Sequence, residues 1–271
     1  MRRLVSLMCM CVIAILSMAQ AKYVFMFIGD GMGPHQVLSA EMYLAEMEGK
    51  IGRKQLLMTT FPYSGQAATF SASSGITDSA ASGTCLATGK KTNNGVIGLA
   101  HDSTPVYSVA SQLKQQGWGV GIMTTVTIDH ATPSAHYAHT PSRENYYTIG
   151  TQLVESNFDF FGGAGFSRPL DRNNADAPNL YDLAQQKGYA LVAGYEDVKN
   201  HSAAKKMILL PEYYQDYYTS FAGSLPYAID RTSSDLTLSQ IVEVAIDRLS
   251  TYDRFFIMAE GGKVDYASHA N

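Results

Sequence analysis

The chain has 271 residues, of which 46% are hydrophobic and 16% charged, and it carries 20 lysines and arginines against 24 aspartates and glutamates. This composition is typical of a globular protein with a sizeable core, and it excludes a disordered, collagen-like or coiled-coil chain. The net charge of -4, without a run of five or more like charges, gives no indication of a nucleic acid or an anionic membrane as partner. We therefore expect a small ligand.

The first 21 residues have the three parts of a secretory signal peptide. Two arginines follow the initiator methionine, residues 4–18 are apolar, and residues 19–21 (Ala-Gln-Ala) form a small-x-small cleavage site. A membrane anchor is the less favoured alternative, because the apolar stretch is shorter than the roughly 20 residues that span a bilayer. We expect cleavage after Ala21, a secreted or periplasmic protein, and a mature chain 22–271 without a membrane span.

Short apolar runs recur along the mature chain, and they lack the alternation of a half-exposed strand. Such runs are typical of strands buried on both faces of a parallel sheet. The predicted strands are 23–28, 119–124, 158–161, 190–192 and 255–259. Helical stretches separate them at 36–47, 77–88, 106–116, 145–155, 179–187 and 239–250. This alternation predicts an α/β fold, a three-layer α/β/α sandwich with a mostly parallel central sheet, whose ligands bind at the carboxyl ends of the strands.

A glycine-rich turn, GDGMG at 29–33, follows the first predicted strand. A dinucleotide-binding loop is disfavoured here, because the third glycine comes too early and a proline follows it. The glycines allow a tight turn that would present Asp30 at the strand end as a metal ligand or an anchor. The alternative is a turn aspartate that bonds its own backbone.

The second segment is ITDSAASG at 76–83, and the alanine-rich helix that it opens stops at Gly89. Ser79 would lie in the first helical turn, where the dipole and free backbone N–H groups suit a hydroxyl that carries or faces a phosphate. Helix capping by Thr77 or Asp78 is the alternative. No Gly-x-Ser-x-Gly elbow surrounds Ser79, so we expect a metal rather than a hydrolase triad to activate it.

The third segment is HATPSAHYAHTPSR at 130–143, which comes shortly after the strand at 119–124. Thr132 could supply a hydroxyl oxygen to a hard cation, and the planar fork of Arg143 could hold two phosphate oxygens. Taken singly, each residue is equally consistent with ordinary loop chemistry.

The fourth segment is EGGKVDYASHAN at 260–271, directly after an apolar strand. The strand delivers Glu260 at its carboxyl end, and two glycines then turn the chain. Asp265 and His269 follow at i and i+4, so they would share one face of a helix, a geometry that suits a metal ion. A solvated Asp-His pair on that face is the alternative.

These four blocks resemble, in the same order, the signature blocks of the alkaline phosphatase family. The resemblance runs from Tyr23 to the last residue, and only residues 163–226 are generic. It implies hydrolysis of phosphate monoesters through a phosphoserine on Ser79, with Arg143 holding the phosphate. It also implies two Zn²⁺ ions and one Mg²⁺ ion, small phosphate-ester substrates, and a homodimer.

The resemblance also implies a set of metal ligands. Asp30 would bridge one zinc and the magnesium, and Thr132 and Glu260 would be the other magnesium ligands. Asp265 and His269 would bind the second zinc, which activates the hydrolytic water. Two metal ions about 4 Å apart can clamp the attacking and leaving oxygens of an in-line displacement.

Two positions that border the magnesium site vary in the family. His130 stands where some members have aspartate and others histidine, and it is a candidate for a supporting contact to that metal. Tyr266 follows Asp265 where relatives carry other side chains. The identity of the third metal is therefore open.

Family members have roughly 400 or more residues, and the remaining zinc ligands, an Asp-His pair and a further histidine, have no counterpart in this sequence. We therefore expect a fragment or truncated product, the amino-terminal part of a single catalytic domain. The last strand would then be left with an unpaired edge and an uncovered apolar face.

The alternative function is a catalytically inactive remnant that binds phosphate and metal through Asp30, Arg143 and Glu260. A sulfatase is disfavoured because its Cys/Ser-x-Pro-x-Arg motif is missing. A phosphodiesterase of the wider superfamily is disfavoured because such enzymes typically use threonine where this chain has Ser79.

Overall fold

A computed structural model describes residues 21–220 and 222–270, so the predicted signal peptide lies outside the described residues except for Ala21. Within these residues, six parallel strands form one sheet in the order β1-β6-β2-β3-β5-β4. The strands are β1 (Tyr23–Gly29), β2 (Gly119–Thr124), β3 (Phe160–Gly162), β4 (Tyr189–Ala193), β5 (Lys206–Leu210) and β6 (Phe255–Gly261). The sheet is therefore parallel throughout, as the alternating sequence pattern predicts.

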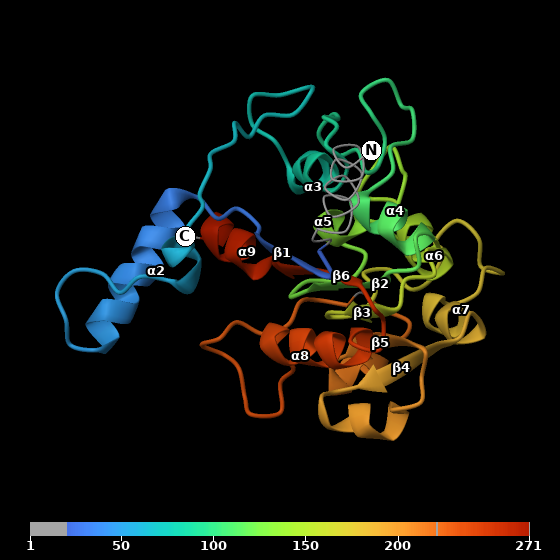
Figure 1. Ribbon diagram of the computed structural model, residues 1–271. Helices are drawn as coiled ribbons and strands as arrows, with labels where there is room; N and C mark the ends of the chain where they lie inside the picture. Colours follow the sequence, from blue (N-terminus) through green and yellow to red (C-terminus); the bar gives the residue numbers. More distant parts are fainter. Residues whose placement is uncertain (1–20, 221, 271) are drawn as a thin grey trace, which may run out of the picture.

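Helices cover both faces of the sheet, which gives the predicted three-layer α/β/α arrangement (Figure 1). One face carries α3 (Ser79–Thr88), α4 (Val109–Gln115), α5 (Ala131–Ser134), α6 (Tyr146–Glu155) and α7 (Leu180–Gln186). The other face carries α8 (Leu238–Leu249). The helices α2 (Pro34–Met47) and α9 (Lys263–Ala270) and the short 3₁₀ turn η1 (Leu57–Thr60) lie outside these layers, whereas η3 (Glu212–Tyr217) packs against the first cluster and η2 (Glu196–His201) against the second. No helix among the described residues is long and apolar enough to cross a membrane.

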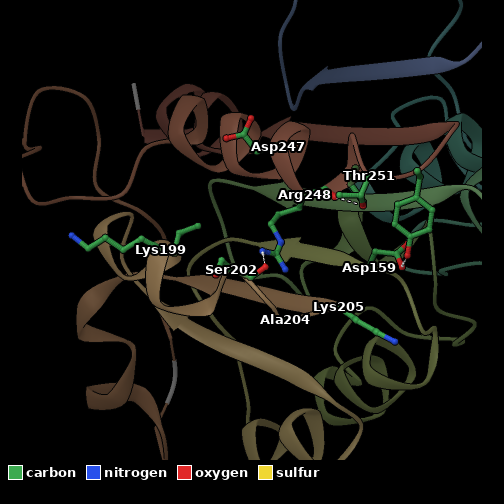
Figure 2. A pocket seen from close by; sticks show the side chains of 11 residues that line it. Asp159, Lys199, Ser202, Ala204, Lys205, Asp247, Arg248 and Thr251 are labelled. Atoms are coloured by element: carbon green, nitrogen blue, oxygen red, sulfur yellow. Dashed lines mark hydrogen bonds between the residues drawn. The ribbon is translucent and has the colours of Figure 1, made fainter.

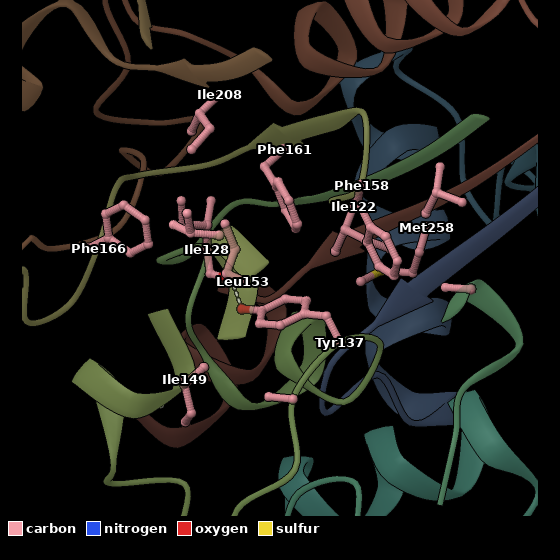
Figure 3. Packing of buried hydrophobic residues seen from close by; sticks show 14 of the residues in the cluster. Ile122, Ile128, Tyr137, Ile149, Leu153, Phe158, Phe161, Phe166, Ile208 and Met258 are labelled. Atoms are coloured by element: carbon pink, nitrogen blue, oxygen red, sulfur yellow. Dashed lines mark hydrogen bonds between the residues drawn. The ribbon is translucent and has the colours of Figure 1, made fainter. Parts of the chain in front are cut away.

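The larger buried cluster lies between the sheet and the helices α3 to α7, and Figure 3 shows its aromatic centre. Tyr137 packs edge-on against Phe161 of β3, with ring centroids 5.6 Å apart. The Tyr137 hydroxyl donates a hydrogen bond of 2.6 Å to the carbonyl oxygen of Ile128. Because buried hydroxyls need a partner, this bond fixes the loop that leads from β2 to α5. The core thus supports the segment that contains His130 and Thr132.

Helix α8 covers the second face through an amphipathic pattern that the sequence shows clearly. Thr237 caps its first turn and forms a capping box with Gln240. The buried side chains of Ile241, Val244 and Leu249 lie against the sheet. These contacts hold β2, β3 and β6 in place, so that their carboxyl ends form a fixed edge.

Two features differ from the sequence-based prediction. Strand β5 was not predicted, because it begins with Lys206 directly after Lys205 and lies in a stretch without motifs. The expected position of the last strand at an unpaired edge is wrong, since β6 lies between β1 and β2. Among the described strands, β1 and β4 each pair with one neighbour, and Phe25 and Phe27 of β1 are 42% and 67% exposed.

Candidate active site

The first side chain of the site is Asp30, which follows β1 in a tight turn. Gly31 has a φ of 64°, a conformation that favours glycine. A Cβ atom on Gly31 would lie 2.7 Å from Oδ1 of Asp265. The turn therefore needs glycine for two reasons, its backbone conformation and the close approach of α9.

Ser79 is the first residue of α3, and its hydroxyl points to the turn after β1. Its Oγ atom donates a 2.9 Å hydrogen bond to Oδ2 of Asp30, 49 residues away in the sequence. Asp78 is the N-cap and accepts a hydrogen bond from the backbone N–H of Ala81. The capping alternative is thus correct for Asp78, while Ser79 keeps a hydroxyl at the positive end of the helix.

Asp78 has a second contact that the sequence reading missed. Its Oδ2 atom accepts hydrogen bonds from the backbone N–H of Gly95 at 2.9 Å and from Nη1 of Arg143 at 3.1 Å. The Arg143 side chain is 24% exposed, so part of its guanidinium stays accessible. One signal for this contact was present in the sequence, the position of Asp78 directly before Ser79. A carboxylate at that position can cap the helix and also orient the guanidinium of Arg143.

Glu260 is fully buried at the carboxyl end of β6, and only one of its oxygens has a hydrogen-bond partner. Oε2 accepts from the hydroxyl of Thr124, a residue that the sequence reading did not single out. Oε1 of Glu260 and Oγ1 of Thr132 are buried without a hydrogen bond of good geometry, although the Thr132 hydroxyl lies near enough to Glu260 to oppose the rise of its pKa. Burial, together with the nearby charge of Asp30, raises the pKa of Glu260 to about 7. A cation would stabilise this arrangement, in which a buried carboxylate with one unpaired oxygen lies next to a buried hydroxyl.

Burial and a neighbouring carboxylate also affect Asp30. Its pKa is raised, mainly by burial and further by the charge of Asp265, although the hydrogen bond from Ser79 opposes the shift. The structure thus brings Asp30, Glu260 and Asp265 within electrostatic reach of one another. Perturbed carboxyl groups of this kind are frequent at functional sites.

His130 connects the third segment with Arg143 and with α9. Its Nε2 atom lies 3.4 Å from Nη2 of Arg143 and 3.5 Å from the hydroxyl of Tyr266. Burial and the charge of Arg143 lower the pKa of His130 to about 4, so the ring is neutral at pH 7. Its Nδ1 atom is buried without a hydrogen-bond partner.

Asp265 and His269 share one face of α9, as their i, i+4 spacing predicts. Oδ1 of Asp265 lies 3.4 Å from Nε2 of His269, whose side chain is 82% exposed. Within residues 21–220 and 222–270, no three His, Cys, Asp or Glu side chains are close enough together to hold a metal ion. The predicted site residues therefore converge, but they do not form a closed metal cage.

A separate cavity of about 520 Å³ lies at the opposite, amino-terminal end of the sheet (Figure 2). Two of its charged groups, Arg248 and Asp159, already have partners. Arg248 donates to the carbonyl oxygens of His201 and Ser202, and Asp159 accepts from Lys114. None of the predicted site residues lines this cavity, so the carboxyl-end cluster remains the candidate active site.

Comparison with known proteins gives consistent results along the chain. A family model described as alkaline phosphatase matches residues 21–271. The tissue-nonspecific alkaline phosphatase of Gallus gallus is 30% identical over 291 residues, covering 92% of this chain and 56% of the relative. Alkaline phosphatase 4 of Bacillus subtilis (strain 168) is 35% identical over 205 residues, covering 72% of this chain and 41% of the relative. The chain therefore spans about half the length of these relatives.

Solved structures agree with the fold described above. A cold-active alkaline phosphatase from the psychrophile Shewanella sp. aligns with a TM-score of 0.76 at 29% identity, over 92% of this chain and 58% of that one. The alkaline phosphatase from the Antarctic bacterium TAB5 aligns with a TM-score of 0.76 at 27% identity, over 93% of this chain and 69% of that one. Together with the sequence match over residues 21–271, these similarities show that the chain belongs to the alkaline phosphatase family.

Proposed function

We propose that this chain acts in the metal-dependent hydrolysis of small phosphate monoesters through a phosphoserine on Ser79. The observation that carries the proposal is the 2.9 Å hydrogen bond from Ser79 Oγ to Asp30, at the first residue of a helix and beside Arg143. Family membership supports the same class of reaction.

In the first step, Ser79 Oγ attacks phosphorus and the bond from phosphorus to the ester oxygen breaks. The Ser79 hydroxyl proton passes to solvent by way of Oδ2 of Asp30, the atom that accepts its hydrogen bond, and the departing oxygen takes a proton from water and leaves as an alcohol. In the second step, water attacks phosphorus, the bond to Ser79 Oγ breaks and inorganic phosphate leaves, and a proton of the attacking water replaces the one that Ser79 lost. The positive end of α3 favours the negative phosphoryl group in both steps.

Arg143 orients the phosphoryl group. Its Nη1 atom is bound to Asp78, which fixes the plane of the guanidinium. The remaining N–H donors can bind phosphate oxygens, and an arginine held in this way loses less conformational entropy on binding.

The residues at the carboxyl ends fit a magnesium ion. The unpaired oxygens of Glu260 and Thr132, with the carboxylate of Asp30 nearby, are hard oxygen donors of the kind that Mg²⁺ prefers. A structure of a His 135 Glu mutant of TAB5 alkaline phosphatase has Mg bound in its M3 site. We assign Asp30, Thr132 and Glu260 to a magnesium site, with His130 in a supporting position.

Asp265 and His269 offer one carboxylate and one imidazole, a donor set that suits zinc. With Asp30 as a shared carboxylate, these side chains would hold the zinc ions of the family site. When bound, such ions act as Lewis acids and lower the pKa of the serine hydroxyl and of water. Because catalytic zinc usually has three protein ligands, we expect the affinity of Asp265 and His269 alone to be low.

The amino-terminal sequence indicates where in or outside the cell this chain would act. Cleavage after Ala21 would export residues 22–271 to the periplasm or the medium, where small phosphate esters are the substrates. The homodimer implied by the family resemblance belongs to the same proposal.

The test is hydrolysis of p-nitrophenyl phosphate by the exported protein in the presence of Zn²⁺ and Mg²⁺. We expect release of p-nitrophenol that is lost in Ser79→Ala and strongly reduced in Arg143→Ala. Ser82→Ala is a matched control, because Ser82 lies on the same helix and its hydroxyl bonds the backbone carbonyl of Asp78. Unchanged hydrolysis by Ser79→Ala would contradict the assignment.

The second candidate is a protein that binds phosphate and metal without turnover. It is favoured by the 82% exposure of the His269 side chain. It predicts a higher melting temperature on addition of Mg²⁺ or Zn²⁺ while p-nitrophenyl phosphate stays intact.

A further inference from the structure

A second cavity, of about 670 Å³, lies on the other side of α9 from Asp265. It is lined by α2, by α9, by Thr125 directly after β2, by Gly261 at the end of β6, and by the loop at 226–231. Figure 1 shows α2 and α9 as neighbours beside the sheet. The hydrogen bond from Gln36 to Ser268 joins these two helices.

The charged side chains that line this cavity are cationic. Lys263 and Arg231 are positively charged, and no Asp or Glu is among the lining residues. Two acids outside the lining interact with these cations, Asp230 with Lys263 and Asp235 with Arg231. The chain as a whole has more acidic than basic residues, so a cavity lined by two cationic side chains and no carboxylate is a local positive region. Such a region favours an anionic ligand.

Lys263 is held in place by partners that do not neutralise its charge. Its Nζ atom donates to Oγ of Ser224 at 2.9 Å and lies 3.3 Å from the ring centroid of Tyr227. Its backbone N–H donates to Oγ1 of Thr125 at 3.1 Å. An ammonium group has three N–H donors, so a positioned cation remains available to a ligand.

The walls beside this cation are apolar. Val264 and Ala267 of α9 and the ring of Tyr227 line the cavity, and Ser39 adds a hydroxyl at its rim. Ligand sites commonly combine an apolar wall with a few fixed polar groups. The combination here matches a ligand with one acidic group and an apolar body.

We propose that this cavity binds a small aromatic or aliphatic acid, with the acidic group at Lys263 and Arg231 and the body against Tyr227, Val264 and Ala267. The site is distinct from the phosphate site at Ser79 and Arg143, because none of those residues lines the cavity. The inference therefore does not depend on the proposed hydrolysis.

The probe is benzenesulfonate, a fully ionised aromatic acid that the proposed reaction cannot cleave, and methyl phenyl sulfone is its neutral counterpart. We expect saturable binding of benzenesulfonate in calorimetry. The affinity should fall about tenfold or more in Lys263→Gln and in Arg231→Gln, the range expected for the loss of one charge-assisted hydrogen bond. Arg231 is exposed, so Arg231→Gln tests the site even if Lys263→Gln fails to fold.

Lys206→Gln is the matched control. Lys206 also donates to uncharged oxygens, of Asn157 and Lys187, and lies 4.4 Å from the ring centroid of Tyr189, but it does not line this cavity. Its replacement should leave the affinity unchanged, as should Arg143→Ala. The proposal would be overturned by absent or non-saturable binding, by equal affinity for the sulfone, by an unchanged affinity in both Gln variants at the cavity, or by loss of binding in Arg143→Ala.

Discussion

Both ends of the parallel sheet contain buried acidic side chains, but the two ends satisfy them in different ways. At the amino end, Asp159 accepts hydrogen bonds from Lys114, from the hydroxyl of Tyr252 and from the backbone N–H of Val120. At the carboxyl end, Glu260 has one unpaired buried oxygen, and it lies within electrostatic reach of Asp30. A compensated carboxylate stabilises the fold, whereas an uncompensated one indicates a site for a missing positive charge.

We expect the largest change in stability when the side chain of Asp159 is removed. Asp159→Ala leaves Lys114 and the other donors without their shared acceptor, so we expect the free energy of unfolding to fall by about 3 kcal/mol or more. Urea unfolding measures this change. Glu196→Ala, which removes an exposed partner of Lys199, should cost less than about 1 kcal/mol, and equal losses in the two variants would contradict the comparison.

At the carboxyl end we expect loss of the carboxylate charge to raise the free energy of unfolding. In the metal-free protein at pH 8, Glu260→Gln removes an unfavourable buried charge and keeps an oxygen that can accept from Thr124, so stability should rise by about 2 kcal/mol. The same variant should lose most of the melting-temperature increase that Mg²⁺ gives to the wild type. Destabilisation by Glu260→Gln under these conditions would show that the carboxylate is already compensated.

The stabilising effect of Glu260→Gln should depend on pH. The pKa of Glu260 is about 7 in the folded protein and 4.5 as its ordinary value, so the folded state binds the proton more tightly. The contribution of Glu260 to stability is therefore fully present below pH 4.5 and is lost as the pH rises to about 7. The stability difference between variant and wild type, measured in a chelator, should be small at pH 4 and level off above pH 7. A stability difference that does not vary with pH would show that it does not arise from the ionisation of Glu260.

The sequence predicted the chemistry-bearing segments at the carboxyl end better than it predicted the topology. The motifs placed Asp30 and Glu260 at strand ends and Ser79 in the first turn of a helix, because these positions follow from local patterns, whereas Arg143 lies in the loop between α5 and α6. The position of β6 between β1 and β2 was not predictable, since strand order depends on long-range packing rather than on local patterns.

Contacts between motifs were also beyond the sequence reading. The bond from Arg143 to Asp78 and the contact of Tyr266 with His130 join residues that are 65 and 136 positions apart. Asp78 alone is explained as a helix cap, and its second contact depends on where the loop with Arg143 returns. Local motifs therefore proposed most members of the candidate site, and the fold determined how those residues contact one another.

A smaller effect would sharpen the account of the turn after β1. Gly31 and Gly49 have nearly the same φ, 64° and 66°, but only at Gly31 would a Cβ meet other atoms. Both replacements by alanine should cost about 1 kcal/mol for the backbone conformation. Gly31→Ala should cost about 1 kcal/mol more, because α9 must move away from Asp30. Equal losses in thermal unfolding would show that α9 is not held against this turn.

The most direct test of the central claim is to locate the phosphoryl group on the protein. The exported chain is incubated with p-nitrophenyl phosphate, Zn²⁺ and Mg²⁺, quenched in acid and mapped by peptide mass spectrometry. We predict phosphate on the peptide that contains Ser79 and none in Ser79→Ala. Hydrolysis of the ester without phosphate on Ser79, or phosphate on another residue, would contradict the account.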